Sequence, residues 1–271
     1  MTTEIGNLEQ LQITNLSIRA ADKWLVEKVS LTIRKGRISG LIGASGCGKS
    51  LTCQSLLGLV PRELHVSGEL RCGPARVALN NQPALCRSRL PNAGLAIILQ
   101  NPMSCFNPVY RISHHFRETG KAHGYRRKDN CPACWRDLLT DVGIEDPQRV
   151  LGLFPFQLSG GMLQRIMIAL ALMVRADYLL ADEATTDLDP VIQAQILDLL
   201  ETIAAKRNIG VLLVSHDLAV IARLASELLV MKAGRIVEQG STEELFAAPA
   251  HPYTQALLDA HLRLYQFAEM G

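Results

Sequence analysis

Hydrophobic and polar residues alternate along the first third of the chain. The alternation is regular over residues 11–18 and again over 29–33, and shorter runs follow at 66–70 and 76–79. A period of two places successive side chains on opposite faces of a sheet. We therefore expect a β-rich region at the start of the chain.

The middle of the chain has a different pattern. Residues 94–99 form a short apolar run that is typical of a buried strand. Prolines then recur between positions 102 and 155, separating helix-like pieces such as 135–142. Another helical run begins after Gly160-Gly161 and continues to residue 174. This part of the chain is expected to be mainly helical.

The last third alternates strands with helices. Residues 178–181 and 211–214 are compact apolar runs with polar residues on either side, as in strands that are buried on both faces. Between them, apolar residues recur at helical spacing, namely Ile192, Ile196, Leu199, Leu200 and Ile203. Strand–helix–strand order predicts an α/β fold with a parallel sheet and right-handed crossovers.

Composition and charge restrict the function only mildly. The chain has 271 residues, of which 48% are hydrophobic and 20% charged, and its net charge of +2 gives no reason to expect nucleic acid as a partner. Its longest uncharged apolar run, residues 166–174, has nine residues, whereas a membrane span needs about 20. We also expect no secretory signal in residues 1–10. Any membrane spans would have to come from another polypeptide.

Residues 43–50 match the phosphate-binding pattern G-x-x-x-x-G-K-[ST]. They read Gly43, Ala44, Ser45, Gly46, Cys47, Gly48, Lys49 and Ser50. The loop lies between an apolar run, 38–42, and a helix-like run, 51–59, so its N–H groups and the helix start can hold phosphate oxygens. Lys49 would reach the β- and γ-phosphates and Ser50 would bind Mg²⁺. The alternative is a glycine-rich turn before a helix. Cys47 inside this loop, among seven scattered cysteines, favours a reducing compartment.

Two further strands are followed directly by polar residues. Asp182 and Glu183 come after the strand at 178–181, and Ser215, His216 and Asp217 come after the strand at 211–214. Ligands of parallel sheets bind beyond the carboxyl ends of strands. Asp182 is expected to hold Mg²⁺, Glu183 to polarise the attacking water and His216 to contact the γ-phosphate. The alternative for the histidine is a helix N-cap formed by its neighbours.

A second anion site is predicted at residues 158–165. Ser159, Gly160, Gly161 and Met162 open a long helix, and their N–H groups would be exposed at its N-terminus. A chain with one ATP has no evident use for two such sites. The simplest solution is a dimer in which each chain covers the nucleotide of the other.

These motifs, in this order, resemble those of the ATP-binding subunits of ABC transporters over nearly the whole chain. Residues 43–50 are similar to Walker A, 179–182 to Walker B and 158–164 to the LSGGQ-type signature, with Met162 where Gln is more usual. The resemblance implies catalytic roles for Glu183, His216 and Lys49. It implies nucleotide contacts by Trp24, Leu51, Gln100 and the loop residues 43–50, magnesium contacts by Ser50, Gln100 and Asp182, and a D-loop role for Asp189. Trp24 would stack on adenine; the alternative is a core or turn aromatic.

The resemblance also implies the architecture. The fold would be a P-loop NTPase (RecA-like) core with a mainly parallel sheet, an N-terminal antiparallel β-subdomain and an inserted helical subdomain. The whole chain, 1–271, would form one ABC ATPase domain. Residues 1–100 and 165–271 would form the nucleotide-binding core with the β-subdomain. Residues 101–164 would form the helical subdomain with the signature motif.

A narrower resemblance connects the chain to the peptide and nickel importer subfamily. It rests on residues 100–108 and on His251-Pro252-Tyr253-Thr254, while 117–119, 159–165, 181–189 and 260–265 are similar to its nickel-importing members. One departure is Ala184, where the family usually has proline after the catalytic glutamate. We expect an altered stiffness of this loop and retained activity.

The function implied is that of an ATPase at the cytoplasmic face of the membrane, which uses ATP with Mg²⁺ to energise uptake of nickel or a related metal or metal chelate. Its partners would be a second ABC ATPase subunit (a paralogue or a second copy), two membrane permease subunits and, indirectly, an extracytoplasmic binding protein, with no nucleic acid. Alternatives are a di- or oligopeptide importer, a non-transport ABC ATPase and a regulatory subunit with little hydrolysis.

Cys131 and Cys134 form a C-x-x-C, and His114, His115 and His123 lie nearby in the sequence. Structural metal sites usually show two ligand pairs with fixed spacing, which these histidines lack. A helix start with incidental cysteines is therefore favoured over metal binding.

Overall fold

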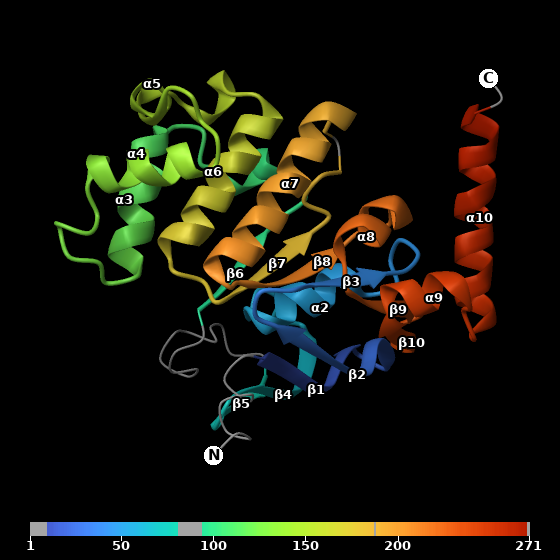
Figure 1. Ribbon diagram of the computed structural model, residues 1–271. Helices are drawn as coiled ribbons and strands as arrows, with labels where there is room; N and C mark the ends of the chain where they lie inside the picture. Colours follow the sequence, from blue (N-terminus) through green and yellow to red (C-terminus); the bar gives the residue numbers. More distant parts are fainter. Residues whose placement is uncertain (1–9, 81–93, 187, 270–271) are drawn as a thin grey trace, which may run out of the picture.

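The computed structural model describes residues 10–80, 94–186 and 188–269, and the side chains as far as residue 261. The first residues, 1–9, for which no secretory signal was expected, lie outside this range. The described part contains two sheets, one with four strands and one with six, and a group of helices beside the larger sheet (Figure 1). The α/β fold predicted from the sequence is confirmed.

The larger sheet forms the core. Its spatial order is β10 (Arg235–Ser241), β9 (Glu227–Lys232), β3 (Ile38–Ile42), β8 (Gly210–Val214), β7 (Tyr178–Asp182) and β6 (Leu95–Ile98). All neighbouring strands are parallel except β9 and β10, which form an antiparallel hairpin. The carboxyl ends of β3, β7 and β8 therefore lie along one edge, where the loop at 43–50 and the acidic pair emerge.

The smaller sheet is antiparallel. Its order is β2 (Lys23–Arg34), β1 (Gln10–Ala20), β4 (Leu64–Cys72) and β5 (Ala75–Leu79). The alternation noted in the sequence separates its buried and exposed faces: Leu11 and Ile13 are buried while Thr14 is exposed. Register shifts in β1 between Ile13 and Leu16 mark a bulge, where Asn15 has a φ of +53°.

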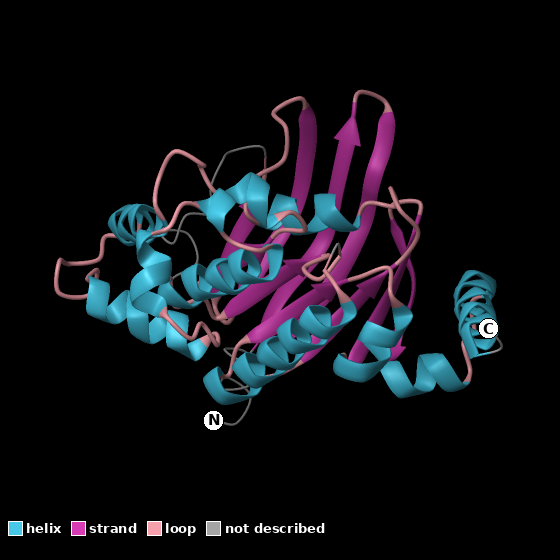
Figure 2. Ribbon diagram, turned by 90° about the horizontal axis from the view of Figure 1, so that it is seen from above, coloured by secondary structure: helices cyan, strands magenta, loops and turns pink. Residues whose placement is uncertain are grey.

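The helices surround the larger sheet. They are α2 (Lys49–Leu56), η1 (Pro102–Cys105), α3 (Ile112–Ala122), α4 (Pro132–Asp141), α5 (Pro147–Gly152), η2 (Pro155–Gln157), α6 (Gly160–Met173), α7 (Pro190–Arg207), α8 (Leu218–Leu224), α9 (Thr242–Ala247) and α10 (Pro252–Glu269). Helices α3 to α5 gather at one end of the molecule and α10 stands at the other, as Figures 1 and 2 show. None of the described helices is both long and apolar enough to span a bilayer.

Both faces of the larger sheet are buried, which explains the continuous apolar runs of its strands. Leu179 and Ala181 of β7 face the core formed with α6 and α7, while Tyr178 and Leu180 face the core shared with α2 and the smaller sheet. Helix α2, with buried Cys53 and Leu56, belongs to this second core. The phosphate loop is thus attached to two well-packed elements, β3 and α2.

The helical segment opens with η1, the next element after β6. Its last helix, α6, runs without interruption through the division expected between residues 164 and 165. A continuous helix therefore connects the helical segment to the core, and the division into 101–164 and 165–271 stays a prediction.

Candidate functional site

The loop between β3 and α2 has a conformation that depends on its glycines. Gly43, Gly46 and Gly48 have φ values of +156°, +76° and +111°, where side-chain-bearing residues are strained. A Cβ on Gly43 would lie 2.2 Å from the Met231 carbonyl oxygen, and one on Gly48 would lie 3.0 Å from the Leu25 carbonyl oxygen. The loop thus packs closely against the end of β9 at Gly43 and against the backbone of β2 at Gly48.

Lys49 lies under this loop and is 4% exposed. Its ammonium group donates to the carbonyl oxygens of Gly43 (2.8 Å) and Ala44 (3.1 Å). Burying an ammonium group is costly unless an opposite charge compensates it. A phosphate bound in the loop would supply that charge, so the position of the buried lysine suits the binding of a nucleoside triphosphate.

Ser50 and Asp182 are in direct contact, although they are far apart in the sequence. The Ser50 hydroxyl donates to the Asp182 carboxylate at 2.9 Å. Burial raises the pKa of Asp182, the charge of Glu183 adds to this, and the Ser50 hydrogen bond and Lys49 oppose it. A carboxylate oxygen and a hydroxyl oxygen side by side are ligands that Mg²⁺ prefers. A cation bound here would offset the free-energy cost of burying the negative charge of Asp182.

Glu183 follows β7 and points towards His216. Its Oε2 lies 3.5 Å from His216 Nδ1 and accepts a hydrogen bond from the Thr186 hydroxyl at 3.4 Å. The Glu183 side chain is largely buried, whereas His216 is 59% exposed. A carboxylate beside an imidazole at the edge that holds the phosphate loop can accept a proton from water.

The alternative for the residues around His216, a helix N-cap, is also realised. Asp217 caps α8 by accepting from the Ala219 N–H at 2.8 Å, and the Ser215 hydroxyl accepts from the Asp217 N–H at 2.9 Å. These two neighbours satisfy the helix start. His216 is therefore not needed for capping and remains available for the site.

Three further residues were predicted to contact the nucleotide, and each comes from a different part of the chain. Gln100 is exposed two residues beyond β6, the strand next to β7. Leu51, in the first turn of α2, packs against the second core. Trp24 is 49% exposed on β2, and the Arg19 guanidinium lies 5.6 Å from its ring centroid. Trp24 is therefore not a core residue, and its stacking on adenine stays a prediction.

Ala184, the residue that replaces the family's usual proline after Glu183, is buried in the core.

The predicted second anion site lies at the N-terminus of α6. Ser159 is the N-cap residue and accepts from the Met162 N–H at 3.3 Å. A Cβ on Gly161 would lie 2.5 Å from Ile192 of α7, so this glycine allows the two helices to approach closely. Gly160 is exposed. Asp189 caps α7 by accepting from the Ile192 N–H at 3.0 Å.

The cysteines and histidines of the helical segment form no recognisable metal centre. Cys131 and Cys134 have their sulfur atoms 3.0 Å apart at the start of α4. His114 stacks on Tyr110, with ring centroids 4.0 Å apart. Among the residues that the structure describes, no group of three or more His, Cys, Asp or Glu side chains could hold a metal ion.

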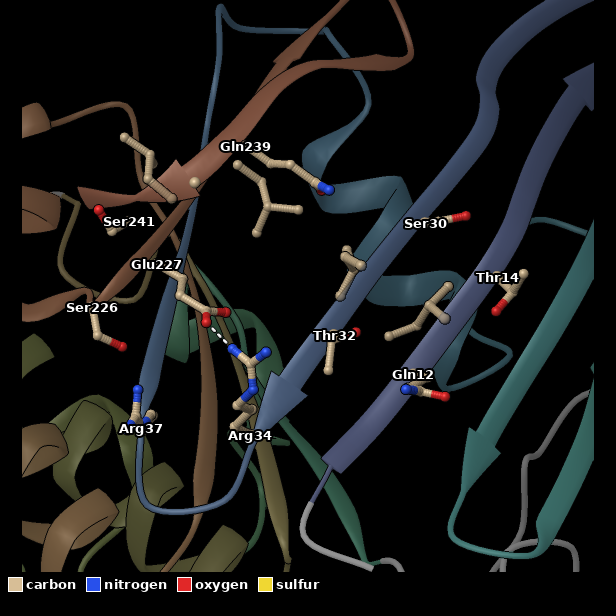
Figure 3. A pocket seen from close by; sticks show the side chains of 15 residues that line it. Gln12, Thr14, Ser30, Thr32, Arg34, Arg37, Ser226, Glu227, Gln239 and Ser241 are labelled. Atoms are coloured by element: carbon tan, nitrogen blue, oxygen red, sulfur yellow. Dashed lines mark ion pairs between the residues drawn. The ribbon is translucent and has the colours of Figure 1, made fainter. Parts of the chain in front are cut away.

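A cleft of about 650 Å³ lies elsewhere, between the smaller sheet and the β9–β10 hairpin (Figure 3). An ion pair between Arg34 and Glu227 crosses it. Arg37 directly precedes β3 and Glu227 begins β9, so the cleft lies at the amino ends of these strands. The residues with matching chemistry are at the opposite edge, and we place the candidate site there despite the size of this cleft.

One contact to the phosphate loop was missed by the sequence analysis. The Ala44 N–H donates to the hydroxyl of Tyr253 at 3.0 Å. The sequence analysis used Tyr253 only as part of a subfamily motif. No local pattern could have predicted this contact, because the two residues are separated by 209 positions.

Comparison with known proteins gives matches over nearly the whole chain. The family model "ABC transporter" matches residues 26–186, and "Oligopeptide/dipeptide transporter, C-terminal region" matches 237–269. The protein named nickel import ATP-binding protein NikD from Rhodospirillum rubrum is 48% identical over 254 residues, covering 93% of this chain and 94% of that protein. The protein of the same name from Brucella abortus is 42% identical over 268 residues, covering 98% of each.

Solved structures agree on the fold. The structure of cbiO1 from Clostridium perfringens, described as part of the ABC transporter complex cbiONQ, has a TM-score of 0.70 at 22% identity and covers 96% of this chain and 97% of its own. A dimeric post-hydrolysis state of the ATP-binding cassette MJ0796, bound to ADP and Pi, has a TM-score of 0.68 at 22% identity, covering 86% and 98%. The family matches agree with the phosphate loop and with the acidic residues Asp182 and Glu183 at the end of β7. The chain therefore belongs to the ABC transporter ATPase family and carries a C-terminal region of the oligopeptide/dipeptide type.

Proposed function

We propose that this chain is the ATP-hydrolysing subunit of an importer for nickel, or for a related transition metal or metal chelate. The observation that carries the hydrolytic part is the contact of Ser50 with Asp182 beside the phosphate loop. Glu183 follows Asp182 directly after β7, and His216 follows β8. The metal cargo is supported by relatives named for nickel import, which are 41–48% identical over most of their length.

The residues divide the work of hydrolysis between them. Lys49 and the N–H groups of the loop bind the β- and γ-phosphates. Ser50, Asp182 and Gln100 would hold Mg²⁺, which when bound neutralises charge on the phosphates. Glu183 accepts the proton of the attacking water, and His216 holds the γ-phosphate beside it. Phosphoryl transfer asks a protein mainly for positioning and charge stabilisation, and these side chains fit that task.

A second ATPase subunit, either a paralogue or another copy of this chain, completes the site. Ser159, Gly160, Gly161 and Met162 would cover the triphosphate held by the partner, with Asp189 near the same contact. The exposed N-terminus of α6 supports this, since N–H groups at a helix start bind anions. Binding of ATP would then close the pair and hydrolysis would reopen it.

The membrane partners are proposed to be two permease subunits that dock on the helical segment from the membrane side, with this chain at the cytoplasmic face and an extracytoplasmic binding protein delivering cargo. Large apolar side chains are exposed there, namely Met103, Val109, Tyr110 and Phe156. The segments that carry them lie together, because the Ile112 N–H donates to the Leu153 carbonyl oxygen at 2.9 Å. This surface follows Gln100 directly, so it can transmit the state of the nucleotide.

A second candidate cargo is a di- or oligopeptide, and the match of residues 237–269 to the oligopeptide/dipeptide C-terminal region favours it. Uptake of nickel, cobalt and a dipeptide in cells that lack this chain discriminates the two. Loss of nickel or cobalt uptake alone supports the metal importer, and loss of dipeptide uptake alone supports the peptide importer. Unchanged uptake of all three, with co-purification of ribosomes or DNA instead of a permease, would contradict transport altogether.

A further inference from the structure

Tyr253 holds one peptide unit of the phosphate loop from outside the loop. The peptide that joins Gly43 to Ala44 is bonded at both ends: its carbonyl oxygen accepts from Lys49 at 2.8 Å, and its N–H donates to the Tyr253 hydroxyl at 3.0 Å. The plane of this peptide is therefore fixed between a loop lysine and a residue of the C-terminal helix.

Tyr253 is itself anchored through its backbone and its ring. Its own N–H donates to His251 Nδ1 at 3.0 Å, and the Lys232 ammonium lies 4.8 Å from its ring centroid. Lys232 is the last residue of β9, the strand that borders β3. The ring is thus held by a cation–π contact next to the strand that leads into the loop.

The segment before Tyr253 is tied to β10. The Glu238 carboxylate accepts from the N–H groups of Ala250 (2.7 Å) and His251 (3.2 Å). Burial acts to raise the pKa of Glu238, but the hydrogen bonds that its carboxylate accepts outweigh this, and the pKa is lowered overall. The charged carboxylate is therefore the form that accepts these hydrogen bonds. The turn before α10 is therefore tied to β10 through Ala250 and His251.

We infer that Tyr253 is a positioning residue for nucleotide binding, an inference that rests on the proposed nucleotide site. The Lys49 ammonium group has three N–H donors, and phosphates that enter the loop compete for them with the carbonyl oxygens of Gly43 and Ala44. The Tyr253 hydroxyl then remains to hold the Gly43–Ala44 peptide in its orientation. A loop that already has the conformation needed for binding loses less conformational entropy when ATP binds.

The test is Tyr253→Phe in the full-length chain, which removes the hydroxyl and keeps the ring over Lys232. We expect the Kd and KM for MgATP to rise about 3- to 10-fold, as for one lost hydrogen bond, with kcat within about twofold and an unchanged melting temperature. Tyr125→Phe is the matched control. It removes a hydroxyl that donates to the Met173 carbonyl oxygen at 2.6 Å, in the helical segment, and should leave the KM for ATP unchanged.

A wild-type KM in Tyr253→Phe would overturn the inference, as would a lower KM, since the hydroxyl would then oppose binding. A fall in kcat at constant KM would overturn it too, because Tyr253 would then act in the chemical step. Lys49→Ala separates this from a failure of the proposed site. If Lys49→Ala binds ATP normally, the site itself is wrong; if it loses binding while Tyr253→Phe behaves as wild type, only the inference about Tyr253 fails.

Discussion

Glu183 has a backbone conformation that is rare for a residue with a side chain. Its φ is +49°, and its N–H donates to the Val214 carbonyl oxygen at 3.0 Å. Such conformations cost about 1–3 kcal/mol and persist where the surroundings enforce them, often at active sites. Here the hydrogen bond to β8 holds the turn, and the carboxylate faces His216. The strained backbone lowers the stability of the fold, and what it provides is a fixed orientation of the Glu183 carboxylate towards His216.

Glu183→Gln is expected to lower ATPase turnover by a factor of about 10²–10⁴, the usual contribution of a general base, while ATP binding persists. The amide is nearly the same size but cannot accept the proton. Turnover and ATP affinity of the purified chain measure the two effects separately. Lys49→Ala is the complementary variant and should lose ATP binding itself. Wild-type turnover in Glu183→Gln would reject the assignment of the base.

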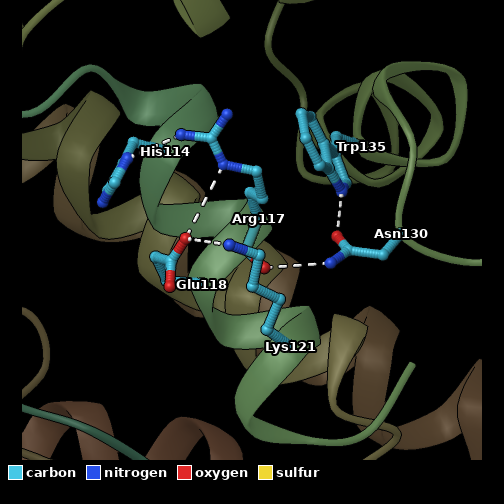
Figure 4. A network of polar contacts seen from close by, with 6 residues as sticks. All are labelled: His114, Arg117, Glu118, Lys121, Asn130 and Trp135. Atoms are coloured by element: carbon cyan, nitrogen blue, oxygen red, sulfur yellow. Dashed lines mark hydrogen bonds and ion pairs between the residues drawn. The ribbon is translucent and has the colours of Figure 1, made fainter. Parts of the chain in front are cut away.

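At the scale of elements, the helical segment is held together by a side chain from a loop. Asn130, just before α4, donates to the Arg117 carbonyl oxygen of α3 at 2.9 Å and accepts from the Trp135 indole N–H at 3.0 Å (Figure 4). A Cβ on Gly120 would lie 2.3 Å from the Asn130 side chain. The glycine thus leaves space for the asparagine that joins α3 to α4.

Asn130→Ala is expected to destabilise the protein by about 1–3 kcal/mol, because the buried indole N–H of Trp135 loses its partner. Urea unfolding measures the change. In the Asn130→Ala background, Trp135→Phe should cost less than it does in the wild-type protein, since the N–H is already unpaired. Equal costs in both backgrounds would show that the two side chains are not coupled.

His115 gives the same segment a dependence on pH. Burial lowers the pKa of its imidazole, with His114 adding to the effect and the Asn107 carbonyl oxygen opposing it. Between the lowered pKa and the ordinary value of 6.5, the unfolded chain binds more protons than the folded one. Stability contributed by His115 is therefore present above pH 6.5 and is lost as the pH falls through the lowered value.

Urea unfolding at pH 7.5 and at a pH of about 5 checks this expectation. His115→Gln stays neutral at both values, so it should lose less stability on acidification than the wild-type protein. The difference between the two proteins is the measure, because other groups titrate in both. An equal loss would mean that His115 does not contribute to the pH dependence.

At the scale of the whole molecule, the sheet order brings the chemistry to one edge and leaves the N-terminus of α6 on the helical segment. At this edge Ser50 contacts Asp182, and the next residue, Glu183, lies beside His216. Of the signature residues, Ser159 and Gly160 are exposed, while Gly161 packs closely on Ile192 of α7 and Met162 packs against the core. This arrangement is what the proposed dimer requires, since one part grips the nucleotide and another is free to cover a partner's.

Ser159→Asp and Ser159→Asn test the dimer. Both keep an oxygen that can cap α6, but the aspartate places a negative charge where the partner's triphosphate is expected. In the Glu183→Gln background with MgATP, Ser159→Asn should still assemble and Ser159→Asp should not. Analytical ultracentrifugation measures the assembly, with the partner ATPase added if a paralogue is needed. Equal assembly of both variants would contradict the proposed covering role.

The residues alone were enough to predict the phosphate loop, the strands that lead into Asp182 and His216, the α/β class and the family. Each depends on short-range signals: glycine spacing, apolar runs and the polar residues that follow them. The folded chain was needed to show the contact of Tyr253 with Ala44, the close approach of the Met231 carbonyl oxygen to Gly43 and the joining of α3 to α4 by Asn130. The first two depend on the strand order β10-β9-β3-β8-β7-β6, which brings the last part of the chain beside the first. The third joins α3 to the loop before α4. None of the three leaves a local pattern to detect.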